Sequence, residues 1–116
     1  MTTTFIKTGE CSRTKVQGAG EVAEILNQSL CGAKNVLGML RWLAAGERLD
    51  AQAKPNEHQL VYVMEGQGVI SLDAKNYDVG RGAGIYLGPG ETASVLHSGT
   101  APLKLFHLVV PRLRGS

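Results

Sequence analysis

The chain has 116 residues, of which 43% are hydrophobic and 19% charged, so it suits one compact domain and is too apolar for a disordered segment. Its formal net charge of +2 comes from 12 basic and 10 acidic residues scattered along the chain, which argues against a nucleic-acid partner. No apolar run approaches the roughly 18 residues of a membrane-spanning helix, and MTTTFIKTGE lacks a signal-peptide core. We therefore expect a cytoplasmic protein without a membrane partner.

The first third of the chain predicts peripheral elements followed by one buried strand. Residues 1–20 are polar and predict an edge strand and a loop. In residues 21–30 apolar side chains recur at helical spacing, which predicts one short amphipathic helix, with a strand as the alternative. Residues 36–44 predict a strand buried on both faces, in which Arg41 and Trp42 point to opposite sides because side chains alternate along a strand.

The remainder of the chain alternates short apolar runs with turns rich in glycine and proline. These turns lie at GQG (66–68), AKNYDVGRGAG (74–84) and GPGE (88–91). The pattern predicts about eight short strands that follow one another every 8–12 residues, which is typical of an all-β sandwich or barrel. The strands expected here are residues 59–65, 69–73, 85–87, 92–97 and 103–110.

Two glycine-bounded stretches carry a family pattern. The first reads Gly46-x5-Gln52-x-Lys54-x4-Gln59-x6-Gly66 and the second reads Gly82-x5-Gly88-x-Gly90-x2-Ala93-x3-His97, with 15 residues between them. These spacings resemble the paired motifs of the cupin superfamily, G-x5-H-x-H-x4-E-x6-G and G-x5-P-x-G-x2-H-x3-N. The resemblance implies a single-domain cupin jelly-roll β-barrel over residues 1–116, with its core at about 36–111, an N-terminal arm at 1–20 and a tail at 112–116.

The residues at the metal-ligand positions depart from the family. Metal-binding cupins have histidine, histidine, glutamate and histidine where this chain has Gln52, Lys54, Gln59 and Ala93. An ammonium and a methyl group offer no lone pair, and glutamine carbonyls bind transition metals weakly. We therefore expect no metal cofactor at the usual site.

A displaced metal site is the alternative. If three residues instead of four separated Lys54 from the next ligand position, that position would be His58 in place of Gln59. His97 and His107 would then complete a three-histidine site for a divalent transition metal. Strand alternation puts His58 and Gln59 on opposite faces, so this site requires a bulge between them.

The same motif positions predict a polar set inside the barrel. Lys54 and His97 are the candidate catalytic residues, because a desolvated lysine and a histidine can transfer protons near neutral pH. A lysine at the barrel mouth with its ammonium in water is the alternative for Lys54. The candidate ligand-binding residues are Gln52, Gln59, Arg41, Tyr62 and Tyr86.

Three functions remain open from the sequence. The first is a metal-independent pocket that binds a small polar or anionic molecule, as in a sensor or carrier. The second is a metal-independent isomerase, epimerase, cyclase or dehydratase that uses Lys54 and His97. The third is a metal-dependent oxygenase or decarboxylase with displaced histidine ligands. In each case the resemblance to cupins, and the edge strands of a barrel this small, lead us to expect a homodimer.

Overall fold

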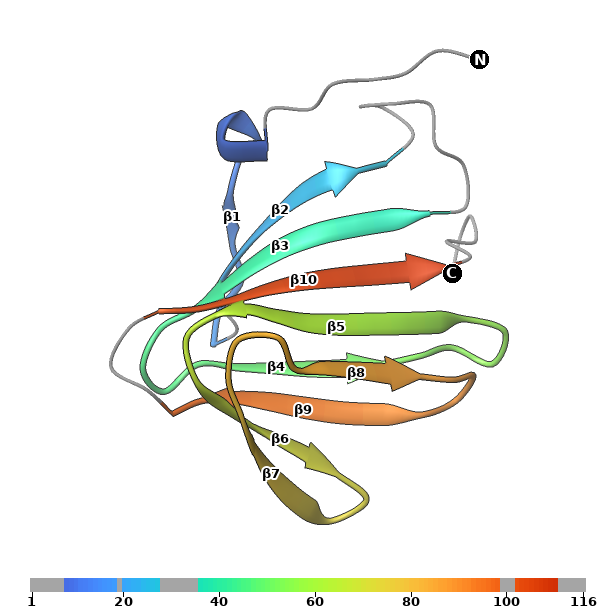
Figure 1. Ribbon diagram of the computed structural model, residues 1–116. Coiled ribbons are helices and arrows are strands. Elements are labelled where there is room, and N and C mark those ends of the chain that lie inside the picture. The colour runs from blue at the N-terminus through green and yellow to red at the C-terminus, as the bar shows by residue number, and fades with distance from the viewer. Residues whose placement is uncertain (1–7, 19, 28–35, 99–101, 111–116) are drawn as a thin grey trace.

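Ten antiparallel strands in two sheets form most of the part of the chain that the structure describes (Figure 1). The computed structural model describes residues 8–18, 20–27, 36–98 and 102–110. Within these ranges the helical content is one 3-10 turn, Thr8–Glu10, and no helix is long and apolar enough to cross a membrane. The chain is thus an all-β barrel of two sheets, as its turn spacing predicts.

The larger sheet has six strands and the smaller has four. The order in the larger sheet is β1 (Thr14–Lys15), β2 (Glu21–Leu26), β3 (Leu37–Leu43), β10 (Leu103–Val110), β5 (His58–Glu65) and β8 (Gly84–Leu87). The order in the smaller sheet is β4 (Arg48–Gln52), β9 (Thr92–His97), β6 (Gly68–Leu72) and β7 (Lys75–Val79). Two strands far apart in sequence, β3 and β5, therefore share the last strand, β10, as their common partner.

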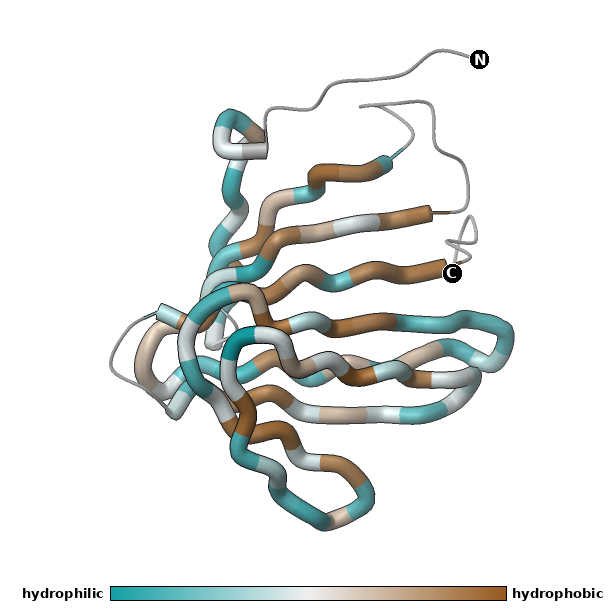
Figure 2. The backbone as a smooth tube through the Cα atoms, in the orientation of Figure 1, coloured by the Kyte–Doolittle hydropathy of each residue, from teal (hydrophilic) through white to brown (hydrophobic). Residues whose placement is uncertain are grey.

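The core lies between the two sheets because alternate side chains of each strand point inward. Figure 2 shows apolar and polar segments alternating along the strands. On β10, Leu103 and Leu105 are fully buried, and they meet Val61 and Val63 of β5 and Val95 of β9. Burial of such side chains contributes about 1.5–3 kcal/mol each, so this cluster is the main source of stability.

The helix predicted over residues 21–30 is wrong for the part that the structure describes. Residues Glu21–Leu26 form β2, which pairs antiparallel with β3, and residues 28–30 lie outside the described ranges. The β-branched Val22 and Ile25 favour an extended backbone, and β3 offers them an unpaired edge. The tertiary pairing therefore overrides the helical spacing, and the alternative strand is correct.

A further strand was missed within AKNYDVGRGAG, which the sequence predicts as turns. Residues Lys75–Val79 form β7, the partner of β6 in a hairpin closed by Asp73 and Ala74. Both residues have positive φ, 47° and 64°, as the two central residues of a type I′ turn require. Alanine is rare at such a position, so the sequence carries no Asn-Gly or Asp-Gly signal for the hairpin.

Gly66 should be the most sensitive of the turn glycines that bound the first motif. Its φ is 91°, and a Cβ at this position would lie 2.8 Å from the carbonyl oxygen of Pro102. We expect Gly66→Ala to lower the free energy of unfolding by about 2–3 kcal/mol in urea titrations. Gly46→Ala is the matched control, because Gly46 has a φ of 82° but a Cβ there would meet nothing within 4 Å. Equal losses in the two variants would show that the contact with Pro102 adds nothing.

Candidate functional site

A pocket of ≈ 340 Å³ opens between β4 and the inner face of β3, β10 and β5. Its apolar wall is formed by Leu37 and Met39 of β3 and Val109 of β10. Arg41, Gln59 and His107 point into it from the same sheet, and residues of β4 form the opposite side. The strand that is expected to be buried on both faces, β3, thus places Arg41 in the pocket and Trp42 on the outer side, where Arg13 and Lys104 lie over its ring.

Four polar side chains that line the pocket form one hydrogen-bonded chain. Arg41 Nε donates to His107 Nδ1 at 3.0 Å, and His107 Nε2 donates to Gln59 Oε1 at 2.8 Å. Gln59 Nε2 then donates to Glu57 Oε1 at 2.9 Å and to the backbone oxygen of Gln52, also at 2.9 Å. Because Arg41 must donate, His107 carries its proton on Nε2, and each bond in the chain points from Arg41 toward Glu57.

The charge state of His107 follows from this arrangement. Burial and the neighbouring Arg41 guanidinium lower the pKa of His107 from 6.5 to about 4. A protonated ring would place an N–H on Nδ1 against the N–H of Arg41, so the neutral ring is the form that completes the chain. Burial also lowers the pKa of Arg41, which stays cationic at neutral pH.

Arg41 is a half-buried cation with no ion-pair partner in the described part of the chain. Its guanidinium contacts His107 Nδ1 and, through Nη2, the sulfur of Met39 at 3.6 Å. Among the residues that the structure describes, the ion pairs are Arg13–Glu21 and Arg48–Asp50, and neither includes Arg41. A guanidinium removed from water has most to gain from a carboxylate or phosphate that meets its planar donors.

The structure places Gln52 and Lys54 differently from a barrel in which both project inward. On β4 the buried side chains are Leu49 and Ala51, followed by Ala53, whereas Gln52 and Lys54 are exposed at the rim of the pocket. The alternation is fixed by pairing with β9, where Ala51 lies opposite Ala93 and Gln52 opposite Thr92. Lys54 therefore lies at the mouth of the pocket, the position given above as the alternative for this lysine.

Glu57 is a site residue that the sequence interpretation missed. It is not among the candidate residues predicted from the sequence, but its side chain is only 5% exposed. Its Oε1 accepts from the backbone N–H of Lys54 at 3.2 Å as well as from Gln59. Strand alternation could have revealed this position, because Glu57 precedes Gln59 by two residues and therefore lies on the same face.

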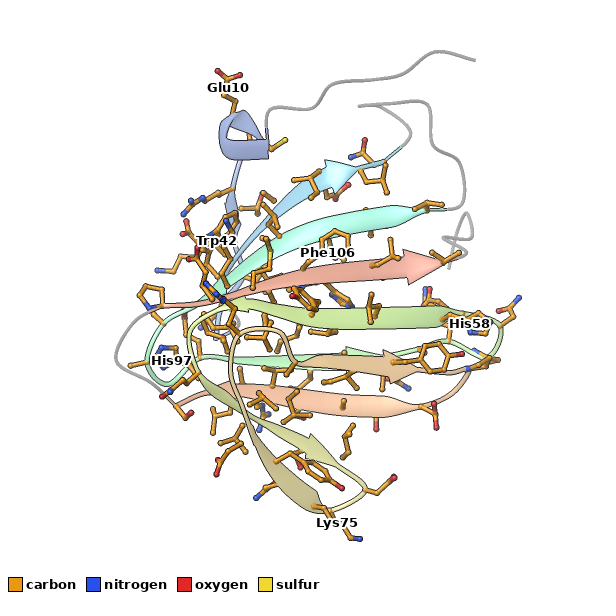
Figure 3. All side chains as sticks on the ribbon, in the orientation of Figure 1. Glu10, Trp42, His58, Lys75, His97 and Phe106 are labelled. Carbon is orange, nitrogen blue, oxygen red and sulfur yellow. The ribbon has the colours of Figure 1, made fainter. Side chains whose placement is uncertain are left out.

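The other predicted site residues lie outside the pocket. Tyr62 and Tyr86 are on the outer face of β5 and β8, exposed by 40% and 61%. His58 is beside them, with Nδ1 2.6 Å from the hydroxyl of Tyr86. Figure 3 shows His58 and His97 at opposite ends of the strands. His97 is buried at the end of β9, opposite Gly68, and does not line the pocket with Lys54.

The three histidines of the displaced metal site are consequently not brought together. No bulge separates His58 from Gln59, since the pairing of β5 with β10 is regular from His58 to Val63. Within the described ranges, no group of three or more His, Cys, Asp or Glu side chains could hold a metal ion. The donor set does not fit a metal, and the expectation of no metal cofactor remains a prediction.

Comparison with known proteins places this fold and pocket in a family. A model of the AraC-like ligand-binding domain matches residues 40–111, more than half of the chain. The chain belongs to the AraC-like ligand-binding domain family. The match runs from the second half of β3 through β10 and therefore contains most of the pocket, including Arg41, Gln59 and His107. No curated protein matches this AraC-like domain.

Solved structures share the fold of this AraC-like domain at low sequence identity. A predicted oxalate decarboxylase from Thermotoga maritima superposes with a TM-score of 0.80 at 19% identity, covering 92% of this chain and 98% of the other. For the polyketide cyclase RemF from Streptomyces resistomycificus the TM-score is 0.78 at 17% identity, with coverage of 99% and 83%. KdgF from Halomonas sp. gives 0.77 at 14% identity, with 97% of each chain covered. At identities this low, the solved structures show the fold alone. The match to the AraC-like ligand-binding domain, which has a cupin-type fold, confirms the resemblance to cupins.

Proposed function

We propose that the pocket between β4 and the larger sheet binds a small anionic molecule, and that Arg41 is its anchor. The observation that carries the proposal is the half-buried Arg41 guanidinium, whose only side-chain hydrogen-bond partners among the described residues are His107 and Met39. The chain's membership of a ligand-binding family supports it. The protein would then act as a sensor or carrier.

The directed hydrogen-bonded chain supports an anion at the Arg41 end of the pocket. Glu57, the acceptor that ends this chain, is separated from Arg41 by His107 and Gln59. An anion near Arg41 would therefore meet a cation and avoid the Glu57 carboxylate. In a partly dehydrated pocket such a charge-assisted contact contributes about 1.5–3 kcal/mol, which corresponds to tenfold or more in affinity.

Arg41→Gln should weaken this binding about tenfold or more. We expect a panel of small carboxylates to raise the melting temperature of the wild type, with affinities from isothermal titration calorimetry at least about tenfold weaker in Arg41→Gln. Arg81→Gln is the matched control, because Arg81 is exposed and lies outside the pocket. Equal binding by both variants, or a preference for neutral sugars over carboxylates, would contradict an anion site at Arg41.

The geometry gives less support to the other two functions. Proton transfer by Lys54 and His97 would need both side chains at one substrate, and only Lys54 lines the pocket. A metal-dependent reaction would need the three histidines within one coordination sphere, yet His58 lies outside with Tyr86. Neither observation favours a second candidate over binding alone.

A homodimer remains part of the proposal, with its contact on the outer face of the larger sheet. The sequence suggests two segments for this contact, the N-terminal segment and residues 103–110. The second forms β10, which is paired on both edges, so only its outer face is available. Beside it, Leu60, Tyr62 and Tyr86 are exposed apolar side chains. We expect light scattering to give twice the 12.3 kDa chain mass, and Tyr86→Glu to lower it. Tyr77→Glu, on the hairpin β6–β7, is the control, and a monomeric wild type would contradict the dimer.

A further inference from the structure

Among the residues that the structure describes, one edge of β4 has no partner strand and faces the pocket. The strand pairs with β9 on one side only, because it is the terminal strand of the smaller sheet. Its residues Leu49 to Gln52 line the pocket together with Arg41. Backbone groups on this open edge are therefore available to whatever occupies the pocket.

Three hydrogen bonds show which residues of β4 point toward the open edge. The N–H of Arg48 donates to the carbonyl of Gly18 at 3.0 Å, and the carbonyl of Gln52 accepts from Gln59 at 2.9 Å, so these two residues face away from β9. Ala53 faces the other way, with its N–H donating to Glu91 at 2.9 Å. Because the N–H and C=O of one strand residue point to the same side and alternate along the strand, Asp50 faces the open edge with Arg48 and Gln52.

Asp50 differs from its two neighbours on this edge. Arg48 is bonded to the β1–β2 turn and Gln52 to Gln59, whereas the backbone N–H and C=O of Asp50 have no hydrogen-bond partner on the open side within the described part of the chain. An N–H and a C=O side by side form a donor and acceptor pair. Such a pair binds a partner that offers an acceptor and a donor at matching spacing, as an added strand residue does.

The Asp50 edge lies where two cavities meet. The pocket of ≈ 340 Å³ and a second cavity of ≈ 470 Å³ beside the turn at Gln17 and Gly18 share Arg41, Leu49 and Asp50 in their walls. A ligand anchored on Arg41 thus has the free backbone pair beside it and room on both sides.

The Asp50 carboxylate does not oppose an anion at this place. Its Oδ1 accepts from Ser94 Oγ at 2.7 Å and pairs with Arg48 Nε at 3.1 Å. Ser94 is its partner on β9, so the side chain lies on the exposed face of the smaller sheet. The backbone of Asp50 and its charge therefore act on different sides of β4.

We infer that the ligand is a carboxylate with a hydrogen-bond donor on its α-carbon, as in an N-acylated amino acid or an α-hydroxy acid. This inference rests on the proposed anion site at Arg41. One carboxylate oxygen meets the Arg41 guanidinium and the other accepts from the N–H of Asp50, while the α-donor bonds the C=O of Asp50. In an N-acylated amino acid the side chain and the acyl group extend into the two cavities.

Matched pairs of carboxylates test the role of the α-donor. N-Acetylglycine and 4-oxopentanoate differ only in an N–H replaced by CH₂, and lactate and 2-methylpropanoate differ only in a hydroxyl replaced by a methyl. We expect the full-length wild type to bind the donor member of at least one pair about fivefold or more tightly in calorimetry, the value of one hydrogen bond. The pair that discriminates identifies the acylamino or the hydroxy acid as the class.

Two variants test the N–H of Asp50. Asp50→Pro removes this N–H at an open strand edge, where proline is tolerated, and we expect it to weaken the carboxylates about fivefold or more. Asp50→Ala removes the same carboxylate but keeps the backbone N–H, so the loss of affinity in Asp50→Pro is measured relative to Asp50→Ala. If Asp50→Pro does not fold, amide hydrogen exchange of the wild type replaces it, and N-acetylglycine should slow exchange at Asp50.

The outcomes separate this inference from the proposed function. Equal affinity within both pairs, with binding still about tenfold or more weaker in Arg41→Gln, would overturn the inference and leave the anion site intact. An Asp50 amide that exchanges at the same rate with and without bound N-acetylglycine would also overturn it. If no carboxylate binds the wild type, the proposed function fails and the inference fails with it.

Discussion

Acidification from pH 7 to pH 4 is expected to remove about 3 kcal/mol of folding free energy through His107 alone. The pKa of His107 is lowered from 6.5 to about 4 by burial and by Arg41. Between these two values the unfolded chain binds a proton at this histidine that the folded chain does not, so stability falls as the pH falls. The contribution is fully present above pH 6.5 and is lost progressively as the pH approaches 4, at about 1.4 kcal/mol for each unit of the shift.

The charged groups around His107 set the size of this effect. Arg41 contacts the ring directly and opposes its protonation, Glu57 is reached through Gln59, and Asp50 and Lys54 line the same pocket. Urea titrations at several pH values would measure the slope. The control is His107→Gln, which does not titrate, and we expect its stability to fall less steeply with acid. If the two slopes were the same, His107 would not be the group that is responsible.

Gln59→Leu is expected to be the most destabilising single change in the pocket, with a loss of about 4 kcal/mol in the free energy of unfolding. The amide of Gln59 accepts from His107 and donates to Glu57 and to the backbone carbonyl of Gln52. Leucine would leave all three groups without this partner. Each buried polar group that loses its partner costs about 1–3 kcal/mol, which exceeds what the larger apolar side chain regains.

Gln52→Leu provides the control for this loss. Gln52 contributes only its backbone carbonyl to the hydrogen-bonded chain, and its side chain is exposed. We expect a change within about 0.5 kcal/mol, as for other exposed positions. Chemical denaturation would measure the free energy of unfolding of both variants. Similar losses in Gln59→Leu and Gln52→Leu would mean that the hydrogen bonds of the Gln59 side chain do not stabilise the fold.

The sequence predicted strands correctly where turn residues bounded a segment of alternating apolar and polar side chains. Residues 92–97 and 103–110 are the observed β9 and β10, since GPGE and SGTAP separate alternating apolar runs. The prediction failed where the apolar spacing suggested the wrong element or where the turn lacked its usual residues. β2 carries helical spacing that pairing with β3 overrides, and the turn before β7 uses Asp73 and Ala74 in place of glycine.

The candidate site was harder to predict because motif spacing gives position along a strand but not the face. Gln59 and Arg41 line the pocket, whereas on β4 the inward positions belong to Ala51 and Ala53 rather than Gln52 and Lys54. That register is set by β9, which lies about forty residues later in the chain. The role of Asp50 could not be foreseen, because it depends on a strand edge that only the sheet order reveals.

The position of β10 between β3 and β5 bears on how the protein is made. Until residues 103–110 leave the ribosome, β3 and β5 have no common partner, and the larger sheet is divided into two pieces with open edges. Fully buried residues of the core, Leu103 and Leu105, arrive with the same strand. The nascent chain must therefore remain without its central pairing until β10 has been synthesised, and the long sequence separation between β3 and β10 makes that closing step slow.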